Sequence, residues 1–224
     1  MKKLQSSLLA VFTAIAVSGS AHAAVIIENI GSTAYRNPAE YSAGLGYQFV
    51  VGASDLSVTA LGIFDARALT DQQGLLAAAD VSLFRVDGVP TSSTGTLLAT
   101  TSFAAGTDGE VSTGYAYNTL ATPVTLTAGA RYVLQTTGAN FFTDFTPSTA
   151  LNSAVTREFA RIGGTGSSAS LLATTALTPD GYNTANAQFT VVPEPSTAVA
   201  LFIASVGFGL LTLRHRSRLS KQPV

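Results

Sequence analysis

The 224-residue sequence predicts an all-β domain, an antiparallel β-sandwich that is jelly-roll-like, over residues 24–192. Short apolar or alternating runs recur along this region, turn-forming residues separate them, and no sustained helical period lies between them. Strands connected in this way favour an antiparallel sandwich over a parallel sheet with crossover helices.

The expected strands follow the apolar runs in chain order. They cover residues 47–51, 56–64, 81–86, 96–103, 115–120, 124–127, 131–136, 141–145, 159–162 and 188–192. Glycine, proline, asparagine or aspartate at 87–90, 107–109, 128–129, 163–166 and 179–181 predicts turns between them. The only helical candidate, residues 74–79, is too short to change the fold class.

Charge and reactive residues exclude several functions for this region. Residues 24–192 hold six arginines, no lysine and twelve acidic residues, a net charge of −6 that disfavours nucleic-acid binding. The chain has no cysteine, and both histidines, His22 and His215, lie outside the region. A Ser-His-Asp triad and a Cys- or His-ligated metal site are therefore excluded there, and we expect no enzyme activity, metal or cofactor.

The N-terminus has the three parts of a secretory signal peptide. Lys2 and Lys3 are followed by an apolar stretch at 8–17 and then by small residues that end in Ala21-His22-Ala23. We expect a signal peptide at residues 1–23, with Ala21 and Ala23 at the signal peptidase site and a mature chain that begins at Ala24. The alternative is an uncleaved membrane anchor, for which the apolar stretch is short.

The C-terminus predicts one transmembrane helix. Residues 196–213 are eighteen residues without a charge, and a helix of that length covers roughly 27 Å, enough to cross a bilayer. The basic tail 214–224 follows directly, and its excess of arginine and lysine places it in the cytoplasm, with the body of the protein outside. The alternative is a buried core helix.

Pro193, Glu194 and Pro195 stand just before this helix. A Pro-Glu-Pro triplet, an apolar helix and a basic cluster, here over residues 193–224, together resemble the PEP-CTERM sorting signal of Gram-negative bacteria. The resemblance implies recognition of the triplet by exosortase, a membrane-embedded protease, with Arg214, Arg216 and Arg218 as the retention cluster. It also implies an inner-membrane intermediate and a final place on the cell surface or in the extracellular matrix. A plain juxtamembrane linker is the alternative.

A second resemblance covers residues 45–134. The phrases at 46–51, 56–65, 81–84, 95–100, 115–117 and 123–134 follow one another in an order similar to that of a family of exported bacterial β-sandwich domains. This family has no assigned function and often occurs beside carbohydrate-active modules. It implies a sandwich fold and transfers no catalytic residue.

Two kinds of side chain are candidates for a site. Tyrosine rings can stack on sugars, and Tyr115 and Tyr117 are the expected ligand contacts, with packing at a strand end as the alternative. Carboxylates could serve a hydrolase or hold calcium, with solvated turn residues as the alternative; they are Asp65, Asp71, Asp80, Asp108, Glu110 and Asp144. The dispersed arginines are expected to be surface partners of the acids.

These features predict an exported protein of the cell surface or biofilm matrix, with a structural or adhesive role linked to exopolysaccharide. Its expected partners are signal peptidase and exosortase during maturation, the membrane through the C-terminal helix, and polysaccharide. A non-catalytic carbohydrate-binding module is the alternative, and a hydrolase the third candidate.

Overall fold

The computed structural model describes residues 23–30, 44–69, 74–110, 113–137, 149–162, 171 and 182–193. Eleven strands and one 3₁₀ turn occur in these ranges: β1 Ala24–Val25, β2 Ile27–Asn29, β3 Leu45–Val51, β4 Leu56–Phe64, η2 Ala66–Leu69, β5 Ala79–Val86, β6 Gly95–Phe103, β7 Tyr115–Leu126, β8 Arg131–Thr137, β9 Ala150–Leu151, β10 Val155–Ile162 and β11 Ala185–Val191.

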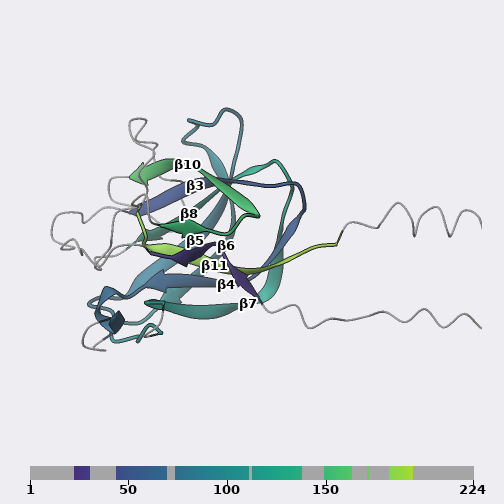
Figure 1. Cartoon of the computed structure of the whole chain (residues 1–224). Coiled ribbons are helices and arrows are strands. Elements are labelled where there is room, and N and C mark those ends of the chain that lie inside the picture. The colour runs from purple at the N-terminus through teal and green to yellow at the C-terminus, as the bar shows by residue number, and fades with distance from the viewer. Residues whose placement is uncertain are drawn as a thin grey trace, which may run out of the picture.

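The strands form an antiparallel β-sandwich, which confirms the predicted fold class at that level. One sheet has the order β1-β11-β4-β7, the other has the order β10-β3-β8-β5-β6, and β2 pairs with β9 in a short ribbon. All strand pairs are antiparallel. The two sheets lie face to face (Figure 1). The connections β3–β4, β4–β5, β6–β7 and β7–β8 each pass from one sheet to the other.

The core is built by alternating residues from both sheets. In β3, Tyr47, Phe49 and Val51 are at most 1% exposed and belong to the main core cluster. In β4, Leu56 and Val58 face the core, and a register shift after Val58 moves the next inward residue to Leu61. A β-bulge of this kind keeps the apolar residues inside when the alternation slips by one position.

The predicted strand at 56–64 has the observed bounds of β4. The other predicted strands are also present, but at least one end of each differs from the prediction. The predicted strand at 141–145 lies outside the described residues. Two predicted strands, 115–120 and 124–127, are one strand, β7. Residues 120–123 form a bulge opposite Thr59, between the strand pairs Val58–Val124 and Ala60–Thr119. Proline at position 123 is compatible with this strand, because an edge strand with a bulge does not need every backbone N–H for pairing. The helical candidate 74–79 is irregular up to Ala79, where β5 begins.

The two ends of the sandwich differ in their connections. The proximal end, as we call it, holds the connections 52–55, 87–94 and 127–130, which are four to eight residues long. Its turn at Ala128-Gly129 was predicted, and Gly129 has the positive φ of 72° that the turn requires. Strands at the opposite, distal end are joined by connections of eleven to twenty-two residues, at 30–44, 65–78, 104–114, 138–149 and 163–184.

Candidate functional site

A cavity of about 250 Å³ lies at the distal end, beside β2 and the start of β7. Its floor and rim differ in burial: Tyr115 and Ile27 are 1% and 3% exposed, whereas Glu28 and Asn29 are exposed. Half-buried side chains complete the described lining, namely Ile30 and Thr113. Four of these six residues are polar, so the cavity suits a ligand that forms hydrogen bonds.

Tyr115 is the most buried of the described lining residues. Its ring packs against Phe64 at a centroid distance of 5.3 Å, and its hydroxyl is buried without a hydrogen-bond partner. Burial raises the pKa of Tyr115 well above its usual value, and the neighbouring Tyr47 and Tyr117 raise it further, so the phenol stays neutral. A buried hydroxyl without a partner costs about 1–3 kcal/mol, which makes Tyr115 an exception that calls for an explanation.

The structure changes the role that the sequence predicts for the two tyrosines. A ring that is 1% exposed offers no face for a sugar to stack on, so stacking does not fit Tyr115. Tyr117 is half-buried in the same strand, and its ring lies over Gly62. A Cβ at Gly62 would lie 2.5 Å from Cε1 of Tyr117, so only glycine leaves room for this ring.

The wall of the cavity formed by β2 is fixed to β11 by Asn186. This fully buried amide accepts the Ile27 N–H at 2.9 Å and donates to the Ile27 carbonyl at 2.9 Å. On the rim, Asn152 Nδ2 donates to Glu28 Oε1 at 2.6 Å. Side chains from two distant segments therefore hold this wall in place before any ligand arrives.

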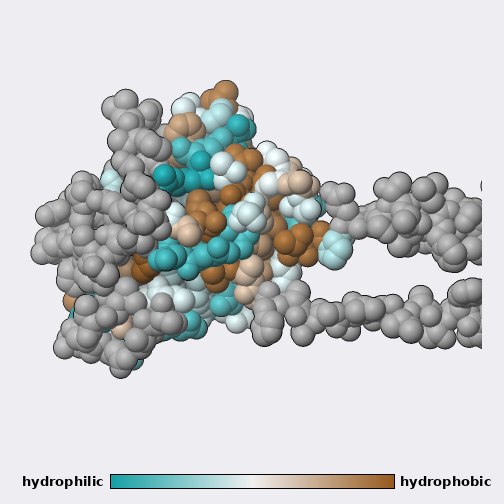
Figure 2. Space-filling model, in the orientation of Figure 1, coloured by the Kyte–Doolittle hydropathy of each residue, from teal (hydrophilic) through white to brown (hydrophobic). Residues whose placement is uncertain are grey.

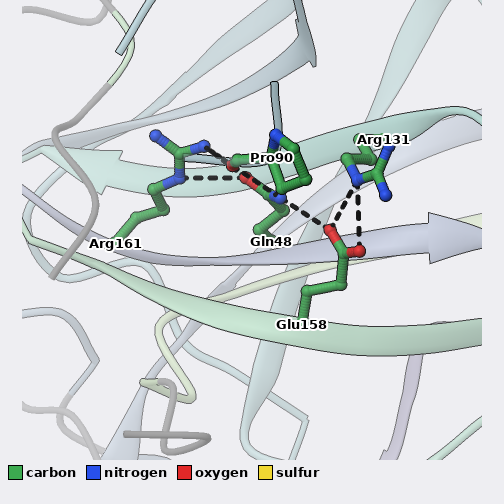
Figure 3. Close-up of polar contacts among 5 residues, drawn as sticks. All are labelled: Gln48, Pro90, Arg131, Glu158 and Arg161. Atoms are coloured by element: carbon green, nitrogen blue, oxygen red, sulfur yellow. Dashed lines mark hydrogen bonds and ion pairs between the residues drawn. The ribbon is translucent and has the colours of Figure 1, made fainter. Parts of the chain in front are cut away.

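A second polar arrangement covers the outer face of the five-stranded sheet (Figure 3). Arg161 is 0% exposed and donates to Gln48 Oε1, to the Ser92 carbonyl at 2.7 Å and to the Pro90 carbonyl at 3.3 Å. Gln48 Nε2 in turn donates to Glu158 Oε2 at 2.7 Å. Burial lowers the pKa of Arg161 to about 10, although the charge of Glu158 opposes this shift.

This network has a structural role. Its donors, Gln48 and Arg161, already give their hydrogen bonds to oxygen atoms of the protein, and these bonds join the turn 87–94 to β3 and β10. The prediction that the arginines lie at the surface is wrong for Arg161, which is fully buried and donates to three neutral oxygens, those of the Gln48 side chain and the Ser92 and Pro90 carbonyls. It is confirmed for two exposed or half-exposed pairs, Arg131 with Glu158 at 3.0 Å and Arg85 with Asp87 at 3.4 Å.

The carboxylates do not gather in the described part of the chain. No group of three or more His, Cys, Asp or Glu side chains there could hold a metal ion. Asp65 is 2% exposed and accepts the backbone N–H groups of Arg67 at 3.0 Å and Gly109 at 3.2 Å, so it ties two loops together. Asp80 accepts the Ser102 hydroxyl at 2.6 Å. Asp71 and Asp144 lie outside the described residues.

Most of the predicted export signals lie outside the described residues as well: Ala21, Glu194, Pro195, the helix 196–213, Arg214, Arg216 and Arg218. Ala23 and Pro193 are described, and both are exposed. Within the described ranges, no helix is long and apolar enough to cross a membrane.

The described surface shows no broad apolar patch in the view of Figure 2, where hydrophobic areas alternate with hydrophilic ones. Large exposed apolar residues are scattered along the chain; they are Leu76, Val89, Leu97, Val191 and Val192. Single residues of this kind are ordinary on a protein surface and indicate no interface by themselves.

Comparisons with known proteins identify no family. No protein-family model and no curated protein matches the sequence. A structure of the Gx strain of infectious bursal disease virus is 14% identical with a TM-score of 0.24, covering 90% of this chain. A mutant VP2 protein of the same virus, in derived T=1 particles, is 16% identical with a TM-score of 0.23, covering 88% of this chain. This chain spans about half of each, 51% and 48%, and likenesses this weak carry no functional meaning.

Proposed function

We propose that this is an exported, non-catalytic β-sandwich protein of the cell surface or extracellular matrix of a Gram-negative bacterium. In this proposal signal peptidase removes residues 1–23, the helix 196–213 holds the chain in the inner membrane, and an exosortase-type protease acts near Pro193-Glu194-Pro195. The mature domain then has a structural or adhesive role linked to exopolysaccharide.

The observation that best supports this proposal is the position of the two ends of the domain. β1 pairs antiparallel with β11, with Ala24 opposite Phe189 and Val25 opposite Gln188, so the chain enters the sandwich beside the place where it leaves. Val192 N–H donates to the Asp55 carbonyl at 2.9 Å, which fixes the exit at the proximal end. Figure 1 shows β11 leaving the sandwich on this side. A domain held at one end presents its other end outward.

The strand order suits such a role. With β10 set aside, four strands in the order β1-β11-β4-β7 oppose four in the order β3-β8-β5-β6. We infer from this arrangement and its sheet-crossing connections that the fold is a jelly roll with one added edge strand. The described strand ends at the distal end are separated by eleven to twenty-two residues along the chain, and segments that join elements of a rigid scaffold are where binding residues concentrate.

Replacement of Pro193, Glu194 and Pro195 by alanine tests the sorting step. We expect the variant to remain at full length in the inner membrane, while the natural chain loses its C-terminal segment. Gln222→Ala with Pro223→Ala, two changes in the basic tail that keep its charge, is the matched control and is expected to mature normally. Normal maturation of the triple variant would refute recognition of the triplet and leave an ordinary membrane anchor.

The second candidate, a carbohydrate-binding module, is favoured by one observation, the polar cavity whose floor is Tyr115. Binding of the native polysaccharide by the purified chain tests it. Absence of binding would leave a structural role alone.

A further inference from the structure

We propose that the short segment 193–195 holds the proximal end of the sandwich against the phospholipid headgroups of the membrane. The contact surface surrounds the point where the chain leaves the domain; we call it the exit platform, and it consists of residues 52–55, 127–130 and 191–193. This inference rests on the proposed function, because it takes the helix 196–213 as the membrane anchor. It adds a partner, the lipid surface, and the residues that contact it.

The length of chain between the fold and the expected helix limits the height of the domain above the bilayer. Val192 N–H donates to the Asp55 carbonyl at 2.9 Å, so the domain holds the chain as far as Val192. The four steps along the chain from Val192 to Ser196 span at most about 14 Å when fully extended. The headgroup layer takes up about 5–8 Å of this length. At that limit Val192 lies about 6–9 Å above the headgroups, and any tilt or bend of the segment brings the platform onto them.

The exit platform is one hydrogen-bonded unit. Asp55 Oδ1 accepts the Ala128 N–H at 2.8 Å, while the Asp55 carbonyl accepts the Val192 N–H. Gly129 N–H donates to the Gly52 carbonyl at 3.2 Å, which joins the two turns of the platform directly. Because both turns are bonded to the chain exit, they approach the membrane together with it.

The side chains of the platform suit the headgroup layer. Apart from Asp55, the turns 52–55 and 127–130 consist of glycine, alanine, serine and threonine, so small side chains and hydroxyl groups meet the lipid. Asp55 is half-buried, and its carboxylate accepts a backbone N–H of the other turn. Val191 and Val192 are 50% and 36% exposed beside the turns, and contact with the interface removes apolar surface of this kind from water.

The charges of the described residues favour the same orientation. Three acids at the distal end, Glu28, Asp108 and Glu110, are exposed. At the proximal end, Asp87 is paired with Arg85 at 3.4 Å. An anionic phospholipid surface repels acids that no cation neutralises, so it favours a domain with its distal end turned outward.

The start of the domain lies at the same end as its exit. β1 begins at Ala24, opposite Phe189, which precedes Val192 by three residues. The two expected cleavage positions, after Ala23 and near Pro193, are therefore close together on the folded domain. A domain that rests on its proximal end keeps both of them at the membrane, where both expected proteases act.

The test is quenching of single fluorescent labels by nitroxide-labelled headgroups. The chain has no cysteine, so Thr127→Cys on the platform and Ala105→Cys at the distal end each introduce a single label site at an exposed position. The membrane form of the chain is reconstituted in vesicles of phosphatidylethanolamine and phosphatidylglycerol that carry the nitroxide on both leaflets. We expect several-fold stronger quenching at residue 127 than at residue 105. Equal quenching at the two positions, or stronger quenching at residue 105, would overturn the inference.

Two insertions make a matched pair for the same measurement. Ten glycine and serine residues between Val192 and Pro193 add a mean span of roughly 17 Å and are expected to lower the quenching at residue 127 to nearly that at residue 105. The same ten residues between Gln222 and Pro223, in the basic tail, are expected to leave the quenching unchanged. Equal quenching in the two insertion variants would show that segment 193–195 does not set the height of the domain, and would overturn the inference.

Thr127→Cys keeps the backbone N–H that donates to the Tyr132 hydroxyl at 2.7 Å, and Ala53→Cys, also exposed, replaces it as the platform label if it does not fold. Retention of the chain by the vesicles after an alkaline carbonate wash measures insertion of the helix in parallel. A chain that is retained but is quenched equally at both positions refutes only this inference. A chain that is washed off refutes the membrane anchor of the proposed function, and this inference with it.

Discussion

Replacement of Arg161 by methionine removes the buried cation of the network on the five-stranded sheet and keeps much of the side-chain volume. In the natural chain the guanidinium reaches Gln48 Oε1 and the carbonyls of Ser92 and Pro90. Without it, the Gln48 and Ser92 oxygens lose this donor, whereas the Pro90 carbonyl keeps the Gln48 amide at 3.1 Å. The turn 87–94 would then lose its main attachment to β10.

The expected loss follows from these contacts. The Gln48 oxygen is buried and the Ser92 carbonyl is half-buried, and an acceptor that is buried and left without a donor costs about 1–3 kcal/mol. Methionine recovers part of this cost, because it buries apolar surface and removes the desolvation of the charge that lowers the pKa of Arg161 to about 10. We expect a net loss of about 3 kcal/mol in the free energy of unfolding, or a fall of roughly 6–12 °C in melting temperature for a domain of this size.

Urea and thermal unfolding of the purified chain, followed by circular dichroism, measure this loss. Arg85→Met is the matched control, because Arg85 and Asp87 form an ion pair at 3.4 Å with side chains 53% and 42% exposed. The control is expected to cost at most about 1 kcal/mol. Arg161→Lys is expected to fall between the two, since an ammonium group lacks the planar fork that reaches several acceptors. Equal stability of Arg161→Met and Arg85→Met would refute the role assigned to the network.

Three further predictions concern the tyrosines. In thermal unfolding, Tyr115→Phe is expected to leave the melting temperature unchanged or raise it, whereas Tyr132→Phe is expected to lower the free energy of unfolding by about 1 kcal/mol. The reason is that the Tyr132 hydroxyl accepts the Thr127 N–H, while the Tyr115 hydroxyl has no hydrogen-bond partner. A larger loss of stability in Tyr115→Phe than in Tyr132→Phe would contradict this. Gly62→Ala is expected to cost about 1–3 kcal/mol in the same assay, since the new methyl group collides with the Tyr117 ring; an unchanged melting temperature would show that the ring moves aside freely. In a pH series of urea titrations, the contribution of Tyr115 and Tyr117 to the free energy of unfolding is expected to be fully present below about pH 10 and to be lost above it. Burial raises the pKa of both tyrosines in the folded chain, so the same groups lose their protons at a lower pH in the unfolded chain, and rising pH favours unfolding. The buried guanidinium has a lowered pKa and acts in the opposite direction, so a stability that rises above pH 10 would mean that its effect exceeds that of the tyrosines.

The sequence predicted the long strands well because their signal is local. A strand such as β4 shows its buried residues as a repeated apolar pattern and is bounded by turns, so its ends could be placed from the sequence alone. β1, β2 and β9 are two or three residues long and carry no such pattern. Their pairing depends on partners more than a hundred positions away, which no window of sequence contains.

The candidate site was only partly predictable. Tyr115 and Tyr117 were selected as aromatic residues, and their spacing of two in a predicted strand already places both on one face of the sheet. That this face is the core, and that Tyr115 then lines a cavity with β2, depends on the packing of the two sheets. Arg161 gives no local sign of burial, because Gln48 is 113 positions away and the carbonyls of the turn are 69 and 71 positions away.

The most direct test of the central proposal is intact-mass measurement of the protein recovered separately from the membrane, the cell surface and the medium of its native host. We expect the surface or medium form to begin at Ala24 and end near Pro193, with any additional mass revealing an attached glycan or anchor. A single form that still ends at Val224 in the membrane would contradict sorting and make this a permanently tethered domain. A form that retains residues 1–23 would contradict cleavage by signal peptidase.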